Sequence, residues 1–192
     1  MDSILIFDTE TSGLPPFKMV QKKRTIACPT KYIKYWEDCR MVELAWQIYQ
    51  SNGTFVKSYS SLVYPNGFQI SPESTKVHGI TQKEAITHGK PIQTILQDFE
   101  ADLQTVGTLV AHNIDFDYHV VLSEYVRQSL SMDSLKTKKQ ICTMKDWLQA
   151  DRKWPKLTEL YYECFQEKLQ QTHRALDDVD ACARIFFHLQ GK

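Results

Sequence analysis

The chain has 192 residues, of which 42% are hydrophobic, and its 23 basic residues are balanced by 23 acidic ones. This neutral balance excludes a globally basic coat for nucleic acid and an acidic disordered chain. The longest uninterrupted apolar run covers only residues 4–7, far short of the roughly 20 residues that span a bilayer. The opening Met1-Asp2-Ser3 has no basic leader before a hydrophobic stretch. We therefore expect a single domain over residues 1–192, with no membrane contact and an intracellular location, cytoplasmic or nuclear.

The hydrophobic pattern predicts strands first and then alternating helices and strands. Ile4–Phe7 indicates a buried strand that ends at Asp8, and Ser51-Asn52-Gly53 indicates a hairpin that joins residues 42–49 to 55–64. Thr81-Gln82-Lys83-Glu84 is a capping box that opens a short helix. Further along we expect a strand at 108–111 and helices at 91–103, 113–128, 157–167 and 175–189. This order predicts an α/β domain with a mixed central β-sheet flanked by helices.

Two carboxylates come directly after the first predicted strand, in Asp8-Thr9-Glu10. Side chains two positions apart in an extended segment point the same way, so Asp8 and Glu10 share one face. Like charges held together repel unless a cation joins them, and hard ions such as Mg²⁺ favour oxygen ligands. Two solvated acids in a turn are the alternative interpretation of this pair.

Acids also stand at the starts of two predicted helices, in residues 112–117 and 173–178. A helix cap with favourable N-terminal charge also explains the first group. In the second group His173 precedes Asp178, and a structural histidine is the alternative. Four carboxylates that meet in one cleft are costly without cations to neutralise them, and two metal ions about 3.5–4 Å apart suit in-line attack on a phosphodiester. The three groups together therefore predict a metal-dependent site.

Three motifs of the chain resemble those of a known enzyme family. They are Phe7-Asp8-Thr9-Glu10-Thr11-Ser12-Gly13-Leu14, His112-Asn113-x-x-Phe116-Asp117 and His173-x-Ala175-x-x-Asp178. In order and spacing they resemble the motifs of the DEDDh, or DnaQ-like, family of 3′→5′ exonucleases, most closely the proofreading epsilon subunits of bacterial DNA polymerase III. His78-Gly79-Ile80-Thr81 and Cys142-Thr143-Met144 also fit that family. The similarity extends over nearly the whole chain.

The resemblance implies a ribonuclease-H-like exonuclease fold and a metal-dependent 3′→5′ exonuclease that releases nucleoside 5′-monophosphates. It implies two Mg²⁺ or Mn²⁺ ions held by four acids, Asp8, Glu10, Asp117 and Asp178. His173 is then the general base that takes a proton from the attacking water, because an imidazole exchanges protons near neutral pH. Three further acids are offset from the family's positions and are not expected to be ligands: Asp115, Asp177 and Asp180.

The resemblance also implies substrate contacts by Thr11, Leu14, His78 and Phe116 around the terminal nucleotide. Core packing is the alternative for Leu14 and Phe116, and turn capping for His78. The expected partner is the 3′ end of a single-stranded nucleic acid, with DNA favoured over RNA, and an exoribonuclease is the alternative. A non-catalytic binding module predicts a lost carboxylate or base, yet all five are present. The resemblance admits a polymerase or replication partner without requiring one.

Residues 17–40 depart from the compact bacterial pattern of the family. This insert holds seven basic residues and two acidic ones, so in a neutral chain the remaining 168 residues carry a net charge of minus five. The cations are Lys18, Lys22, Lys23, Arg24, Lys31, Lys34 and Arg40, and the aromatic residues among them are Phe17, Tyr32, Tyr35 and Trp36. Cations interleaved with stacking surfaces suit a single strand, so we expect the insert to guide the 3′ strand. A solvated flap and a protein-docking arm are the alternatives.

Overall fold

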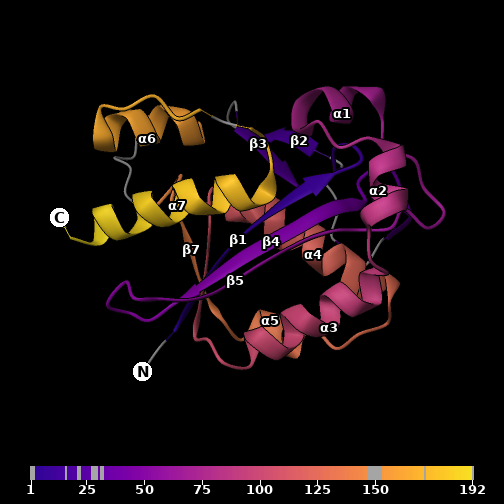
Figure 1. Cartoon of the computed structure of the whole chain (residues 1–192), viewed down its shortest axis with the longest axis horizontal. Helices are drawn as coiled ribbons and strands as arrows, with labels where there is room; N and C mark the ends of the chain where they lie inside the picture. Colours follow the sequence, from indigo (N-terminus) through magenta and orange to yellow (C-terminus); the bar gives the residue numbers. More distant parts are fainter. Residues whose placement is uncertain are drawn as a thin grey trace.

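The computed structural model describes residues 3–15, 17–20, 23–26, 30, 33–146, 153–170 and 172–191. Its centre is a five-stranded sheet in the order β5-β4-β1-β6-β7 (Figure 1). These strands are β1 (Ile4–Thr11), β4 (Met41–Tyr49), β5 (Phe55–Leu62), β6 (Thr108–Ala111) and β7 (Lys139–Cys142). The first three pair antiparallel, whereas β6 runs parallel to both β1 and β7. The mixed sheet predicted from the sequence is thereby confirmed.

Helices cover both faces of the sheet, with α6 and α7 on one side and α3, α4 and α5 on the other (Figure 1). The helices are α1 (Pro72–His78), α2 (Gln82–His88), α3 (Ile92–Leu103), α4 (Ile114–Arg127), α5 (Asp133–Lys136), α6 (Leu157–Phe165) and α7 (Ala175–Gln190). None of the helices in the described ranges has the length and hydrophobicity that crossing a bilayer requires.

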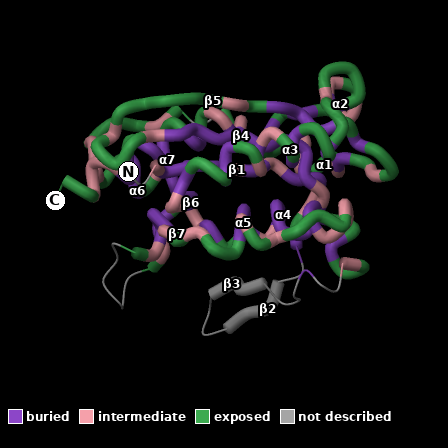
Figure 2. Tube along the Cα trace, turned by 90° about the horizontal axis from the view of Figure 1, so that it is seen from below, coloured by how far each residue is buried: buried purple, intermediate pink, exposed green. Residues whose placement is uncertain are grey.

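Strand β1 contributes side chains to both layers because successive residues of a strand point to opposite faces. Leu5 and Phe7 are buried in the larger hydrophobic cluster, which α3 and α4 complete. Ile4 and Ile6 belong to a second cluster, with α6 and α7. Buried residues follow β1, β4 and β6, while β5 is largely exposed at the sheet edge (Figure 2). The next residues of β1, which include Asp8 and Glu10, continue this alternation.

The helix and hairpin predictions agree with the structure to within a few residues, but some elements were not predicted. Helix α1 is one, although its ends carry clear signals. The Ser71 side chain accepts a hydrogen bond from the Ser74 N–H at 3.0 Å, Pro72 opens the helix, and Gly79 ends it with φ of 75°. Strand β7 and helix α5, each four residues long, were also missed. Strand β1 was predicted to end at Asp8 and instead runs on to Thr11.

The insert at residues 17–40 begins with a separate two-stranded antiparallel ribbon, β2 (Phe17–Val20) and β3 (Lys23–Ile26). The side chains of residues 16–29, 31 and 32 lie outside the described residues, and they include five of the seven cations of the insert and two of its four aromatic residues, Phe17 and Tyr32. A short 3₁₀ helix (Ile33–Trp36) follows and packs against α4. Trp36 was predicted to offer a stacking surface, but it is fully buried in the larger core cluster. Tyr35 is 56% exposed, with the Lys34 ammonium 5.0 Å from its ring centre.

Candidate active site

Three carboxylates from opposite ends of the chain meet beside the C-terminal half of β1. Asp8, Glu10 and Asp178 each offer an oxygen, and these three oxygens lie within 4.8 Å of one another. Asp8 and Glu10 follow Ile4 and Ile6 on the face of β1 that α7 covers. Because α7 packs on β1 and β4, its first turns bring Asp178 to the same place.

The fourth predicted acid, Asp117, is buried in α4 and is fastened to the same strand. Its Oδ1 accepts a hydrogen bond from the Thr9 backbone N–H at 3.0 Å and another from the Thr9 hydroxyl at 2.7 Å. Thr9 stands between Asp8 and Glu10 in β1. One strand therefore carries two acids of the cluster and, through the residue between them, fixes Asp117 beside the cluster.

Asp117 and Asp178 occupy equivalent places in their helices. Each is the fourth residue, counted from Ile114 in α4 and from Ala175 in α7, where the helix dipole favours negative charge. The residues ahead of the two helices, Asn113 and His173, have left-handed backbones with φ of 68° and 53°. Such φ values are uncommon outside glycine and persist where the surrounding structure enforces them.

Burial and mutual repulsion make these acids hard to ionise. Burial raises the pKa of Asp8 well above its usual value, with Asp117, Glu10, Asp178 and Glu43 raising it further. The pKa of Glu10 is raised to about 9, chiefly by burial and then by Asp178 and Glu43. Burial also raises the pKa of Asp117 to about 7, although its hydrogen bonds from Thr9 act in the opposite direction. Without a counter-charge, the cluster therefore retains protons near neutral pH.

Divalent cations fit this set of donors. All the converging groups are carboxylates, the ligands that Mg²⁺ and Mn²⁺ prefer, and three of their oxygens are close enough to share an ion. A bound cation would also remove the repulsion that raises the pKa values of Asp8 and Glu10. Asp8, Glu10 and Asp178, with Asp117 beside them, are the residues that could hold such ions.

A fifth acid, Glu43, lies beside the cluster and was not predicted. It is opposite Glu10 in the β1–β4 pairing and is 2% exposed. Arg174 donates two hydrogen bonds to it, from Nη2 to Oε1 at 2.8 Å and from Nε to Oε2 at 3.1 Å. The Ala175 backbone N–H donates a third, at 3.1 Å. Glu43 is the single charged residue of the mostly apolar β4, and this is the signal that could have drawn attention to it.

The predicted contact residues Thr11 and His78 are engaged with the backbone of the turn after β1. The Thr11 hydroxyl donates to the Gly13 carbonyl at 2.7 Å. His78 is buried, and its Nδ1 accepts from the Ile80 N–H at 3.0 Å. Nε2, which then carries the proton, lies 3.3 Å from the Thr11 carbonyl, and burial lowers the pKa of this imidazole. His78 thus braces the turn, and both of its ring nitrogens are already used.

Leu14 and Phe116 lie in different surroundings. Leu14 is 62% exposed at the tip of the turn, so core packing does not account for it. Phe116 is half-buried and packs against the larger core cluster. Only Leu14 of this pair presents most of its side chain to solvent.

The acids that were not expected to be ligands have partners elsewhere. Asp115 forms an ion pair with Lys145, and Asp177 accepts a hydrogen bond from the Thr172 hydroxyl. Asp180 accepts one from Gln47. None of these three belongs to the group of converging carboxylates found among the described residues.

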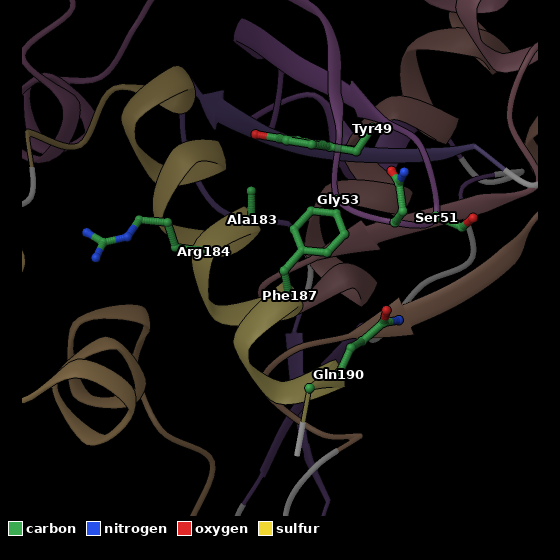
Figure 3. Close-up of a pocket in the computed structure, with 9 residues that line it drawn as sticks. Tyr49, Ser51, Gly53, Ala183, Arg184, Phe187 and Gln190 are labelled. Carbon is green, nitrogen blue, oxygen red and sulfur yellow. The ribbon is translucent and has the colours of Figure 1, made fainter.

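A pocket of about 480 Å³ lies at the other end of the sheet, between the β4–β5 hairpin and the end of α7 (Figure 3). The ring of Phe187 faces the hairpin there, and Tyr49 and Gly53 are among the lining residues. Tyr49 pairs with Ile4 at the start of β1, whereas Glu43 pairs with Glu10 near its end. The pocket is therefore remote from the carboxylates.

A mixed sheet that carries acids on its central strand and on two helix N-termini is the arrangement of a nuclease. Residues 5–186 match the RNase_T family of exonucleases, and the chain belongs to that family. A relative, the PolC-type DNA polymerase III of Caldanaerobacter subterraneus subsp. tengcongensis, is 31% identical over 142 residues, which are 73% of this chain and 10% of that protein. The predicted membership of the DnaQ-like exonucleases is thereby confirmed.

Solved structures of exonuclease I share the fold. E. coli exonuclease I in complex with a dA16 oligonucleotide has a TM-score of 0.72 and 15% identity, with 100% of this chain and 41% of that chain covered. Exonuclease I of Methylocaldum szegediense has a TM-score of 0.75 and 16% identity, at the same coverage. The predicted ribonuclease-H-like fold is confirmed, and the chain spans about two fifths of exonuclease I.

Proposed function

We propose that this exonuclease is metal-dependent and hydrolyses single-stranded DNA, or frayed 3′ ends, in the 3′→5′ direction to nucleoside 5′-monophosphates. The observation that carries the proposal is the convergence of Asp8, Glu10 and Asp178, with Asp117 fastened beside them by Thr9. Two Mg²⁺ or Mn²⁺ ions, when bound, would neutralise these carboxylates and stabilise the charge that develops on the attacking and departing oxygens.

The residues of the proposed active site then have separate roles in hydrolysis. The four acids hold the ions, and the Thr9 hydroxyl and N–H keep Asp117 in one orientation. His173, half-buried just ahead of α7, removes the proton of the attacking water and passes it to solvent. Leu14, exposed on the turn after β1, packs against the terminal base, while Thr11 and His78 fix the shape of that turn.

DNA is the proposed substrate and RNA the alternative. The relatives favour DNA, since one is a DNA polymerase and exonuclease I binds a deoxyoligonucleotide. A comparison of DNA and RNA strands of one sequence distinguishes the two substrates. A polymerase or replication partner remains compatible with the proposal.

The test is a side-by-side assay on single-stranded DNA and RNA of the same sequence, with Mg²⁺, with Mn²⁺ and with chelator. A 3′-labelled strand should release labelled mononucleotide in the first turnover, and a 5′-labelled strand should give a descending ladder. Labelled mononucleotide from RNA alone would establish the exoribonuclease alternative. Tight binding without any product would contradict a catalytic function.

Two aspartates of α4 provide a matched pair of variants for this assay. Asp117→Ala should abolish turnover because it removes a buried acid of the metal site, and circular dichroism should show a folded protein. Asp115→Ala, two residues away and paired with Lys145, should keep the wild-type rate. The reverse result would show that the second motif is misaligned by two residues.

A further inference from the structure

Glu43 and Arg174 form a clamp between strand β4 and the start of α7. Two parallel N–H donors of one guanidinium meet both oxygens of one carboxylate, and the Ala175 N–H adds a third bond to Oε2. Bidentate pairs of this kind fix orientation as well as distance. Because Glu43 is buried opposite Glu10, the clamp is anchored in the strand pair that carries the acids.

Arg174, one partner of the clamp, is the residue directly after His173. The His173 backbone is left-handed, with φ of 53°, and this conformation requires support from its surroundings. His173 lies ahead of α7, outside the hydrogen-bonded turns of that helix. Asp178 lies inside α7, where Val179 and Cys182 are buried against the sheet, and its N–H donates to the Arg174 carbonyl at 3.2 Å. That contact uses the Arg174 backbone, so a change of the Arg174 side chain leaves it in place, whereas the segment that carries His173 loses its bond to Glu43.

We propose that Glu43 and Arg174 are positioning residues that hold His173 where it can act as the general base. This inference rests on the proposed function. A general base must lie within hydrogen-bond reach of the proton that it removes, and a displacement of about 1 Å costs on the order of 10²-fold in rate. Removal of the Glu43 or the Arg174 side chain frees the same stretch of backbone, residues 173–174. Each of the two removals should therefore slow the chemical step by about 10²-fold.

A purely electrostatic effect would have a different signature. Glu43 adds negative charge beside the cluster and Arg174 adds positive charge, so they act on Glu10 in opposite directions. Their removal would then change the rate in opposite directions. A positioning effect instead predicts losses of the same sign and similar size.

The chain provides a matched control in a second clamp. Glu124 is 1% exposed, accepts from Arg40 Nε at 2.8 Å and Nη2 at 3.3 Å, and accepts from the Met41 N–H at 3.2 Å. It resembles Glu43 in burial and in its partners, but it joins α4 to β4 away from His173. Glu124→Gln therefore measures what the loss of a buried clamp does to the fold alone.

The experiment measures single-turnover hydrolysis of a single-stranded oligonucleotide at saturating Mn²⁺, with thermal unfolding of every variant. The hydrolysis rate of Glu43→Gln and of Arg174→Gln should each be about 10²-fold lower than that of the wild type. The rate of Glu124→Gln should stay within about threefold of the wild-type rate. In a protein that already carries His173→Ala, adding Glu43→Gln or Arg174→Gln should lower the rate by less than a further factor of about three, because the general base is already absent. Arg174→Lys keeps the charge without the two parallel bonds, so it should fold and still be slowed.

Several outcomes would overturn the inference. Wild-type rates in Glu43→Gln and Arg174→Gln, beside a slow His173→Ala, would exclude a positioning role and leave the proposed function intact. The positioning role would also be excluded if the rate loss of either change multiplied with the rate loss of His173→Ala in the double variant. A wild-type rate in Arg174→Lys would exclude it as well. A wild-type rate in His173→Ala would remove the base assignment itself, and an inactive wild-type protein would remove the proposed function.

Discussion

Binding of Mn²⁺ should stabilise the fold more at pH 8 than at pH 6. Glu10 has a pKa raised to about 9, so it holds a proton throughout this range. A divalent ion binds the ionised carboxylate and must displace that proton. Each pH unit below the pKa therefore weakens the apparent affinity about tenfold, or about 1.4 kcal/mol. The proton on Glu10 alone therefore predicts that the apparent affinity for Mn²⁺ is about 100-fold lower at pH 6 than at pH 8.

The size of the effect follows from mass action. At a Mn²⁺ concentration of 100 times Kd at pH 8, binding contributes about 2.7 kcal/mol to the free energy of unfolding, and at pH 6 about 0.4 kcal/mol. For a domain of this length, 1 kcal/mol moves Tm by about 2–4 °C. The shift in Tm caused by Mn²⁺ should therefore be about 5–9 °C larger at pH 8.

The metal-free protein should show the opposite trend. Because the folded pKa of Glu10 lies above its ordinary value of 4.5, the proton stabilises the folded state. That contribution is complete below about pH 4.5 and is lost as the pH rises through about 9. Differential scanning fluorimetry of chelator-treated protein, with and without Mn²⁺, measures both trends. Asp115→Ala should behave as wild type and Asp8→Ala should lose the metal effect. An equal Mn²⁺ shift at both pH values would refute the reasoning.

Two further predictions concern single contacts. Thr9→Val removes the hydroxyl that donates to Asp117 at 2.7 Å, so urea unfolding of the metal-free protein at pH 8 should show a loss of about 1.5–3 kcal/mol. Thr9→Ser keeps the hydroxyl and should therefore retain most of the wild-type free energy of unfolding. A Thr9→Val protein as stable as the wild type would show that the hydrogen bond to Asp117 does not stabilise the fold. Leu14→Ala should raise KM for an oligonucleotide several-fold without changing Tm, because the side chain is 62% exposed. An unchanged KM would exclude the base contact.

The parts of the fold with strong hydrophobic patterns could be predicted from the sequence. The helix expected at 91–103 is α3, with Ile95, Leu96 and Phe99 buried, and the strand expected at 108–111 is β6. Helix α1 lacks such a pattern, since Val77 is 56% exposed and its ends are set by capping. Strand β7 exists because it pairs with β6, and a four-residue segment carries too little pattern to show this.

The same distinction applies to the candidate site. The three acids that converge were predicted from motif order, because strand ends and helix starts gather at one edge of such a sheet. The polar end of β1 was cut short in the prediction because apolar periodicity stops at Phe7, while pairing with β4 continues to Thr11. The bond between Glu43 and Arg174 joins residues 131 positions apart, and the sequence alone does not show which distant charges meet.

The converging acids come from residue 8, on an early strand, and residue 178, on the last helix. During synthesis the ribosome therefore releases the first carboxylates long before their partner. The carboxylate cluster is therefore incomplete until α7 packs on β1 and β4. A state of the protein in which α7 has come away from the sheet should bind divalent ions poorly, even where β1 is intact.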